Sequence, residues 1–452
     1  MTIGKQYLIA YIPLVAVAMR VLSTPTANIS YLVVALYALS GRAQAIQALG
    51  LSWLFSMISP GIAAEATAAS VGRYAVLAAA AISVLLRSGI LVKGVRVSRP
   101  VFATLGLGVL LVFHSLLFSP IKDVSVLKAL SWTVAAATLL AAWSGLSGVE
   151  RTVLTRQVFG GLTIVLLCSL PLLPLPLGYL RNGTGFQGVL AHPQAFGPAI
   201  GLLGAWAGSR MLADSKPTWT MVALFGACLV LVVLSEARTA GIALLLGIVL
   251  AGVTSQVLTR GSILGFLPGL RSRRVHLVIG LSLMGVLLAG SALSDRLDQY
   301  FSKRTDSSNL AAAYEASRGA VIERMWVNIQ IQPWQGIGFG IASYPEDMVV
   351  DRDPILGLPT GAAIEKGVLP IAVMEELGVF GFFAVMLWLW MLVRRAARGG
   401  GMTALAVFFT VLLLNMGEYV LFSPGGMGLL SLLLIGWAAT ETRETPTAVA
   451  HA

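Results

Sequence analysis

Fourteen apolar stretches, most of them long enough to cross a lipid bilayer, constrain this chain more than any other feature. A crossing takes about 20 helical residues at a rise of ~1.5 Å each. The second and the last stretch are short, so twelve or thirteen spans also fit, with the second re-entrant or paired with the third. The stretches fall at about 6–22, 27–40, 44–60, 71–91, 100–119, 126–147, 154–178, 193–212, 218–235, 239–257, 275–293, 367–393, 402–421 and 425–439.

The balance of residue types agrees with this pattern. Of 452 residues, 57% are hydrophobic and 11% are charged, whereas a soluble domain carries about 25% charged residues. Lipid must therefore cover most of the surface. We predict an all-α polytopic membrane protein with about 12–14 transmembrane helices. Residues 1–440 form a single transmembrane domain, its first span is retained rather than cleaved as a signal peptide, and residues 441–452 form a disordered cytoplasmic tail.

The distribution of Lys and Arg predicts the orientation. With a cytoplasmic N-terminus, eighteen of these residues fall in cytoplasmic segments, and the short loops of the opposite face hold six: Arg20, Arg73, Lys122, Lys128, Arg181 and Arg238. This asymmetry follows the positive-inside rule. A nucleic-acid-binding protein would gather its bases on one domain or stripe, so the net charge of +11 does not indicate nucleic acid.

One long loop, 295–366, falls on the outer face and holds ten of the 20 acidic residues. Loops of this length are usually functional. Its middle, Ser308 to Gln330, is predicted to be an amphipathic helix on the membrane surface. Arg318 either extends to the interface or points at an anion. The helix carries one stripe at helical spacing: Tyr314, Arg318, Ile322, Met325, Trp326 and Ile329.

Motifs for nucleotide, metal or redox chemistry are absent: there is no phosphate-binding P-loop, no HExxH and no CxxC pair. Cys168 and Cys228 lie inside apolar runs and are interpreted as buried thiols. Gly336 to Gly340 reads as a turn after the loop helix. We therefore expect neither a cofactor nor a metal.

Polar residues at the outer ends of the spans are the remaining candidates for chemistry. Charges at a membrane edge are costly and mark functional sites, and the guanidinium fork of arginine suits phosphate oxygens. An anionic, lipid-linked ligand follows from this chemistry. Each residue also has a structural alternative: arginines can anchor at the interface, glutamates can pair with them, and His192 can cap a helix. The candidates are Arg181, Asn182, Gln187, His192, Glu236, Arg238, Glu365, Lys366, Glu375, Glu376 and Glu418.

Four segments resemble the family of O-antigen ligases and Wzy-type polysaccharide polymerases. They are RNGTGFQGVLAHPQAFG (181–197), SEARTAGIALLLG (235–247), MWVNIQIQPWQGIGFG (325–340) and VMEELGVFGFF (373–383). The order, the spacing and the single large loop match that family over roughly residues 175–440. Each motif alone is weakly specific, and the four together are more so.

The resemblance implies a metal-independent glycosyltransferase of the GT-C type in the bacterial inner membrane, with its active site facing the periplasm. It would transfer glycan from undecaprenyl pyrophosphate to a hydroxyl. Arg181 and Arg238 match the family's donor-holding arginines, and we expect them to line one cavity. The partners implied are the lipid-linked glycan, membrane lipid, and envelope export or chain-length proteins. Further substrate-binding candidates are Gln187, His192, Glu236, Arg304, Arg318, Lys366 and Glu376.

One departure from the family pattern changes the expected reaction. Ligases carry a His-Asn pair shortly before the Glu-Leu-Gly motif, whereas residues 364–368 here contain no histidine. Glu365 is the nearest replacement general base, although it could simply pair with Lys366. We therefore favour a polymerase of repeat units over a ligase acting on a lipid or protein acceptor. A transporter or flippase of lipid-linked oligosaccharide is the alternative from another class, and the lack of an inverted repeat disfavours it.

Overall fold

The computed structural model describes residues 3–89, 98–181, 183–259, 267–277, 280, 310–352, 357, 359–362, 364 and 366–440. Almost all of the regular structure in these residues is helical. The helices are α1 (Ile3–Leu22), α2 (Thr24–Ala38), α3 (Arg42–Met57), α4 (Ala69–Ser88), α5 (Arg99–Phe118), α6 (Lys122–Ser144), α7 (Gly148–Ser169), α8 (Pro193–Ala213), α9 (Trp219–Leu234), α10 (Arg238–Thr259), α13 (Leu310–Ile331), α14 (Leu369–Gly399), α15 (Gly401–Leu414) and α16 (Gly426–Thr440), with short 3-10 turns η1 (Leu170–Leu172), η2 (Pro176–Tyr179) and η3 (Pro268–Arg271).

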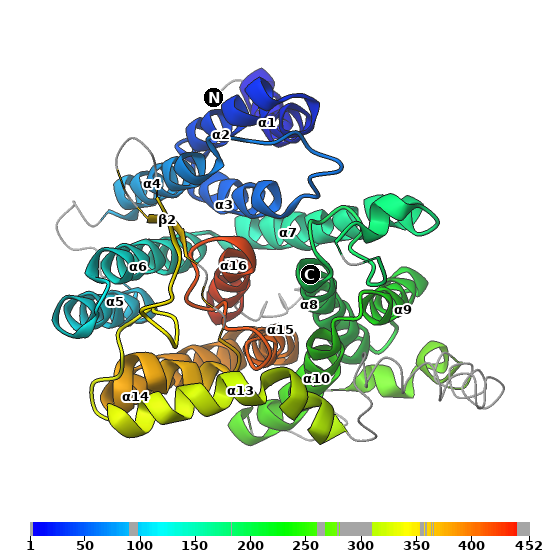
Figure 1. The fold of residues 1–452 in the computed structure, drawn as a ribbon. Coiled ribbons are helices and arrows are strands. Elements are labelled where there is room, and N and C mark those ends of the chain that lie inside the picture. Colours follow the sequence, from blue (N-terminus) through cyan, green and yellow to red (C-terminus); the bar gives the residue numbers. More distant parts are fainter. Residues whose placement is uncertain are drawn as a thin grey trace.

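Helix α16 lies at the centre of the bundle, and α3, α6, α14 and α15 pack against it (Figure 1). Residues Gly428 to Ala439 of α16 are all buried. One apolar core extends from Ala16 of α1 to Ala439 of α16. Around this core, outer helix faces expose large apolar side chains, such as Phe102 at 72% and Leu387 at 69%.

Six helical segments in the described part of the chain are long and apolar enough to cross a membrane: α4, α5, α6, α7 with η1, α10 and α14. Together with the exposed apolar faces, they confirm the predicted all-α polytopic membrane protein. The predicted run 275–293 lies mostly outside the described residues, as does the tail 441–452.

Hydrogen bonds join connecting segments of the chain at two ends of the bundle. At one end, which we call the site end, Ser59 donates to Val189 (2.9 Å) and Phe186 donates to Leu234 (2.8 Å) through backbone N–H groups. At the other end, the basic end, the Arg151 guanidinium donates to the carbonyls of Trp143 (3.2 Å) and Leu146 (3.3 Å). Which end faces the cytoplasm stays a prediction.

Local sequence signals explain several helix boundaries. Ser147 and Glu150 form a capping box at the start of α7, in which each side chain accepts a hydrogen bond from the other residue's backbone N–H. That helix ends at Ser169, shortly before Pro171, because a proline ring cannot continue the hydrogen-bond ladder.

Two features of helices α14 and α15 differ from the sequence prediction. Helix α15 ends at Leu414 rather than near 421, because the Asn415 side chain accepts the N–H groups of Val420 (2.9 Å) and Leu421 (2.7 Å) and folds the chain into a turn. Helix α14 is interrupted at Gly378, whose φ of 65° and ψ of −173° are open to glycine alone.

Helix α13 confirms the predicted loop helix over its described residues and corrects its buried face. Met325, Asn328 and Ile329 are buried, whereas Trp326 of the predicted stripe is 51% exposed. The helix packs along α14 (Figure 1). The prediction placed the buried face of the helix by its apolar residues. Because the polar residue Asn328 is also buried, the true buried face is rotated away from Trp326.

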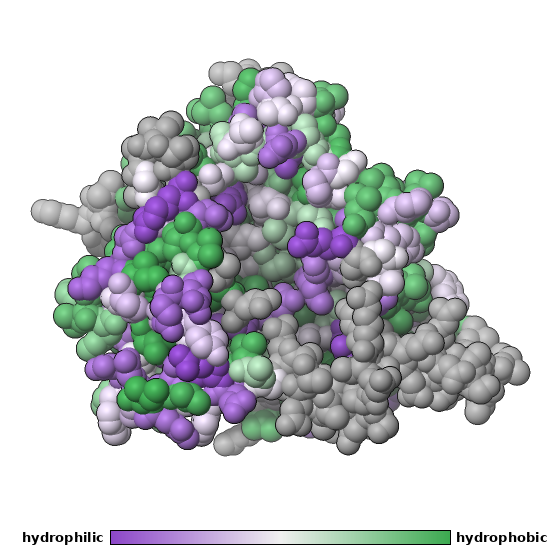
Figure 2. Space-filling view, in the orientation of Figure 1, coloured by the Kyte–Doolittle hydropathy of each residue, from purple (hydrophilic) through white to green (hydrophobic). Residues whose placement is uncertain are grey.

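A short antiparallel hairpin, β1 (Val350–Arg352) and β2 (Pro359–Ala362), was not predicted. It contacts α6 at the site end. In a space-filling view of the face in Figure 1, hydrophilic residues gather on the side of α5, α6 and this hairpin, and hydrophobic residues lie on the flanks near α1 and α9 (Figure 2).

Candidate functional site

A glycine-rich turn, residues 333–340, packs against the interruption of α14. The N–H groups of Ile337 and Gly338 donate to the carbonyls of Glu375 (2.9 Å) and Glu376 (3.0 Å). A Cβ at Gly378 would lie 2.1 Å from the Trp334 carbonyl oxygen. The third and fourth family-like segments therefore meet in space, and glycine is required at the closest approach.

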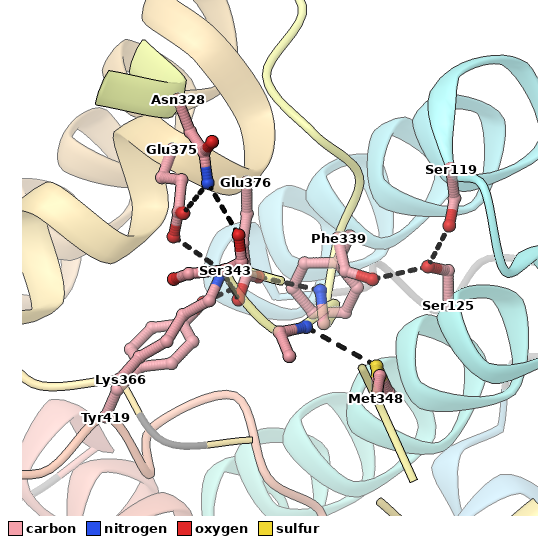
Figure 3. A network of polar contacts seen from close by, with 12 residues as sticks. Ser119, Ser125, Asn328, Phe339, Ser343, Met348, Lys366, Glu375, Glu376 and Tyr419 are labelled. Carbon is pink, nitrogen blue, oxygen red and sulfur yellow. Dashed lines mark hydrogen bonds and ion pairs between the residues drawn. The ribbon is translucent and has the colours of Figure 1, made fainter. Parts of the chain in front are cut away.

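Three buried charges lie beside this turn (Figure 3). The Lys366 Nζ is 2.8 Å from Glu375 Oε2 and 3.1 Å from Glu376 Oε1, and none of the three side chains is exposed. Lys366 lies three residues before the start of α14, and the glutamates lie in the second turn of that helix. A cluster of this kind is held only if other groups satisfy the remaining carboxylate oxygens.

Neighbouring elements supply those hydrogen bonds (Figure 3). Asn328 of α13 donates to Glu375 Oε1 at 2.7 Å, and the Gly340 N–H donates to Glu376 Oε2 at 2.7 Å. The Tyr419 hydroxyl also donates to Glu376 Oε2, at 3.0 Å. Burial, with the Glu376 and Glu375 carboxylates, raises the pKa of Tyr419 well above its ordinary value of 10.0, so its hydroxyl stays protonated.

A cavity of about 810 Å³ opens beside this cluster at the site end. Its walls come from α3, α4 and α6, from the first turns of α8 and α16, and from the hairpin strand β2. The size suits a ligand larger than a single sugar or phosphate. The residues used below that line it are Leu49, Arg73, Leu77, Leu127, Lys128, His192, Gln194, Glu418, Tyr419 and Gly426.

Positive charge converges on this cavity. Arg73 of α4 and Lys128 of α6 line it, as do the N-terminal residues of α8 and α16. Helix N-termini carry partial positive charge and unpaired N–H donors. The Lys128 Nζ lies 5.6 Å from the Phe339 ring centre and 5.8 Å from that of Tyr419, so aromatic faces hold its position.

The expected donor-binding residues Arg181 and Arg238 lie at the site end but outside the lining of this cavity. Their segments touch each other: Thr184 Oγ1 donates to Glu236 Oε2 at 3.2 Å, and Phe186 pairs with Leu234. The first and second family-like segments therefore also meet. Arg181 is exposed, and Arg238 begins α10.

Gln187 and Glu236 have defined structural roles in these segments. The Gln187 side chain is 1% exposed and accepts the Arg181 N–H at 2.9 Å, which closes the loop. Among the described residues, Glu236 is the non-glycine residue with positive φ, at 55°. Strained backbone of this kind persists where the surroundings enforce it and often marks functional positions.

The structure confirms the helix cap at His192, and its role in substrate binding stays a prediction. His192 is the N-cap of α8, with its Nδ1 accepting the Gln194 N–H at 2.9 Å. It also lines the cavity. Because Nδ1 accepts a hydrogen bond, the neutral ring carries its proton on Nε2.

Lys366 and Glu376 stand outside the cavity lining, in the buried cluster. Tyr419, which lines the cavity, donates a hydrogen bond to Glu376 and so joins the cluster to the cavity wall. Glu365, the expected general base, and Arg304 lie outside the described residues, as does Asn182; Arg318 lies in α13, but its side chain also falls outside the description.

Several cavity residues were not singled out as site candidates from the sequence, among them Arg73, Lys128 and Tyr419. Both bases had been assigned to the outer face, and that assignment was the only signal available. The convergence of the two bases depends on α4 packing against α6. Tyr419 was placed inside a span, where its link to Glu376 had no sequence signature.

No protein-family model matches the chain, and no relative was found among curated proteins. The family resemblance therefore stays a prediction from the four segments. Among the residues that the structure describes, His, Cys, Asp and Glu side chains form no group of three or more that could hold a metal ion.

Proposed function

We propose that the protein is a membrane glycosyltransferase that takes glycan from a polyprenyl-pyrophosphate-linked oligosaccharide and adds it to a hydroxyl of the next lipid-linked repeat unit. The reaction polymerises a surface or exported polysaccharide at the periplasmic face. The carrier, the bacterial inner membrane and the GT-C class come from the family resemblance. The cavity at the site end supplies the structural argument.

The observation that carries the proposal is the chemistry of the cavity walls. Two cations, Arg73 and Lys128, and the first turns of two helices line one large space. Leu49, Leu77 and Leu127 line the same space. A pyrophosphate joined to an apolar chain matches this mixture, because fixed cations stabilise the diphosphate that leaves while apolar walls accept its tail.

The buried cluster fits this function as a support. Lys366, Glu375 and Glu376 join α14, α13 and the α15–α16 connection, and that connection forms part of the cavity wall. Groups that stabilise developing charge must be held still before the reaction. The cluster provides such rigidity next to the cavity.

The test uses purified protein in lipid nanodiscs with a lipid-pyrophosphate-linked oligosaccharide as the sole substrate, in the presence of EDTA. We expect a ladder of longer glycans without any other acceptor. Transfer only after a lipid A or protein acceptor is added would indicate a ligase. If the protein binds the lipid-linked donor but never cleaves it, the proposed enzyme activity is wrong and transport becomes the better explanation.

A pair of variants on one helix tests the cavity itself. Lys128→Met removes a cavity cation, whereas Lys122→Met removes an exposed cation one and a half turns away on α6. We expect Lys128→Met to lower kcat/KM about 100- to 1,000-fold, the effect typical of losing one donor to a developing anion, and Lys122→Met to leave it within about twofold. Equal effects of the two changes would contradict the assignment of the cavity.

A further inference from the structure

We infer that Glu418 is the general base of the proposed transfer and takes the proton of the acceptor hydroxyl. This assignment rests on the proposed function. It replaces Glu365, which lies outside the described residues, with a carboxylate that lines the cavity.

Glu418 lies where two spaces adjoin. It lines the large cavity and also a small neighbouring one of about 20 Å³, which Gln194 and Thr239 border. Among the described residues that line the large cavity, it is the one carboxylate. Arg73 of α4 borders the large space and Thr239 of α10 borders the small one, so we expect the acceptor hydroxyl to approach Glu418 from the side of α10.

The backbone around Glu418 is held in place. Asn415, which is fully buried, binds the N–H groups of Val420 and Leu421 with one side-chain oxygen. A Cβ at the preceding Gly417 would lie 2.4 Å from the Thr239 hydroxyl, so this turn packs tightly on α10. A base held on a fixed turn satisfies the geometric requirement for proton transfer.

Four other polar residues of the cavity, His192, Tyr419, Arg73 and Lys128, are less suited to this role. The His192 Nδ1 already accepts a backbone N–H, and its ring proton lies on Nε2. The Tyr419 hydroxyl is protonated and donates to Glu376. Arg73 and Lys128 are cations that attract the donor rather than accept a proton.

The step balances within the ligands named. The acceptor hydroxyl oxygen forms a bond to the anomeric carbon of the donor glycan. The bond from that carbon to the pyrophosphate oxygen breaks, and the pyrophosphate keeps the electron pair. The hydroxyl proton moves to the Glu418 carboxylate, which later releases it to water.

The test compares Glu418→Gln and Glu418→Asp with wild type and with Glu65→Gln, an exposed glutamate at the same end outside the cavity lining. Binding of polyprenyl pyrophosphate, transfer rate and its pH profile are measured in nanodiscs. We expect Glu418→Gln to bind the lipid normally, to lose 100- to 10,000-fold in kcat, and to lose the acidic limb of the profile. Glu418→Asp should retain partial activity and Glu65→Gln should match wild type.

Each outcome of these measurements either supports or overturns the assignment of Glu418 as the general base. Near-normal kcat or an unchanged acidic limb in Glu418→Gln overturns the assignment while the transferase proposal stands. If Glu418→Gln fails to fold, the Glu418→Asp profile decides: a wild-type pH profile with unchanged kcat overturns the role, and a lowered kcat with a shifted limb supports it. The other ionisable side chains that line the cavity are Arg73, Tyr74, Lys128, His192 and Tyr419, and their variants should keep that limb. Wild type that neither binds nor transfers the donor refutes the proposed function itself.

Discussion

Three charged side chains are fully buried: Lys366, Glu375 and Glu376. Each would be costly alone, and the ion pairs with the donors from Asn328 and Tyr419 offset that cost. The cluster thus links the start of α14 to α13 through Asn328 and to the α15–α16 connection through Tyr419.

Lys366→Met should destabilise the protein severely, because it leaves two buried carboxylates without their shared cation. The loss expected for breaking a buried pair is about 3–5 kcal/mol, which should appear as a marked fall in Tm of the detergent-solubilised protein. The triple variant Lys366→Met, Glu375→Gln and Glu376→Gln should recover part of the loss. A single Lys366→Met variant as stable as wild type would show that the cluster is not a structural tie.

The site end contains two pairs of cations, and each pair is a candidate for binding the pyrophosphate. The family-like motifs point to Arg181 and Arg238, whereas the cavity is lined by Arg73 and Lys128. We expect Lys128→Met to weaken binding of polyprenyl pyrophosphate more than Arg181→Ala does, as measured by titration in nanodiscs. The reverse order would place the pyrophosphate at the 181–188 loop. In that case, lysine at position 181 should rescue only partly, because it lacks the guanidinium fork.

At the scale of elements, the break in α14 depends on a single glycine. Gly378→Ala would force a Cβ against the Trp334 carbonyl at a backbone conformation that other residues avoid. We expect a lower Tm and the loss of transfer activity, because the 333–340 turn can no longer dock. Gly226→Ala on α9 is the matched control, since its Cβ would meet no atom within 4 Å. That change should be neutral or slightly stabilising.

The β1–β2 hairpin is tied to α6 by an ion pair between Arg352 and Asp123 at 2.6 Å, with both side chains nearly half exposed. An exposed pair of this kind contributes about 0–1 kcal/mol to stability. Arg352→Ala should therefore leave Tm unchanged, while KM for the lipid-linked donor rises several-fold because β2 is part of the cavity wall. The KM effect should shrink at high salt, where the wild-type pair is already screened. An unchanged KM would show that the hairpin does not govern access.

For the whole molecule, the separation of the two ends predicts the topology. Single cysteines at Glu346 and Ser215, both exposed, report on the site end and the basic end in a background lacking Cys168 and Cys228. A membrane-impermeant maleimide should label the first in intact cells and the second only after the membrane is opened. Labelling in the opposite order would show that the predicted orientation is wrong and that the cavity lies on the cytoplasmic side of the membrane.

Much of the architecture followed from the sequence because lipid imposes a simple rule. Backbone groups in hydrocarbon must be paired within a helix, so runs of apolar residues predict helices, and the bases between them predict which ends gather together. Other features were predictable because they depend on residues close in the sequence. These are the helix at 310–331, the turn at 336–340 and the His192 cap.

What only the tertiary structure decided is which polar residues share a space. Arg73, Lys128, Glu418 and Tyr419 come from segments up to several hundred residues apart, and their convergence depends on how α4 packs on α6 and how α6 and α15 pack on α16. Local sequence carries no record of such packing. The break at Gly378 and the burial of Lys366 with two glutamates likewise arise from long-range contacts, because the energy that holds strained backbone and buried charge comes from distant partners.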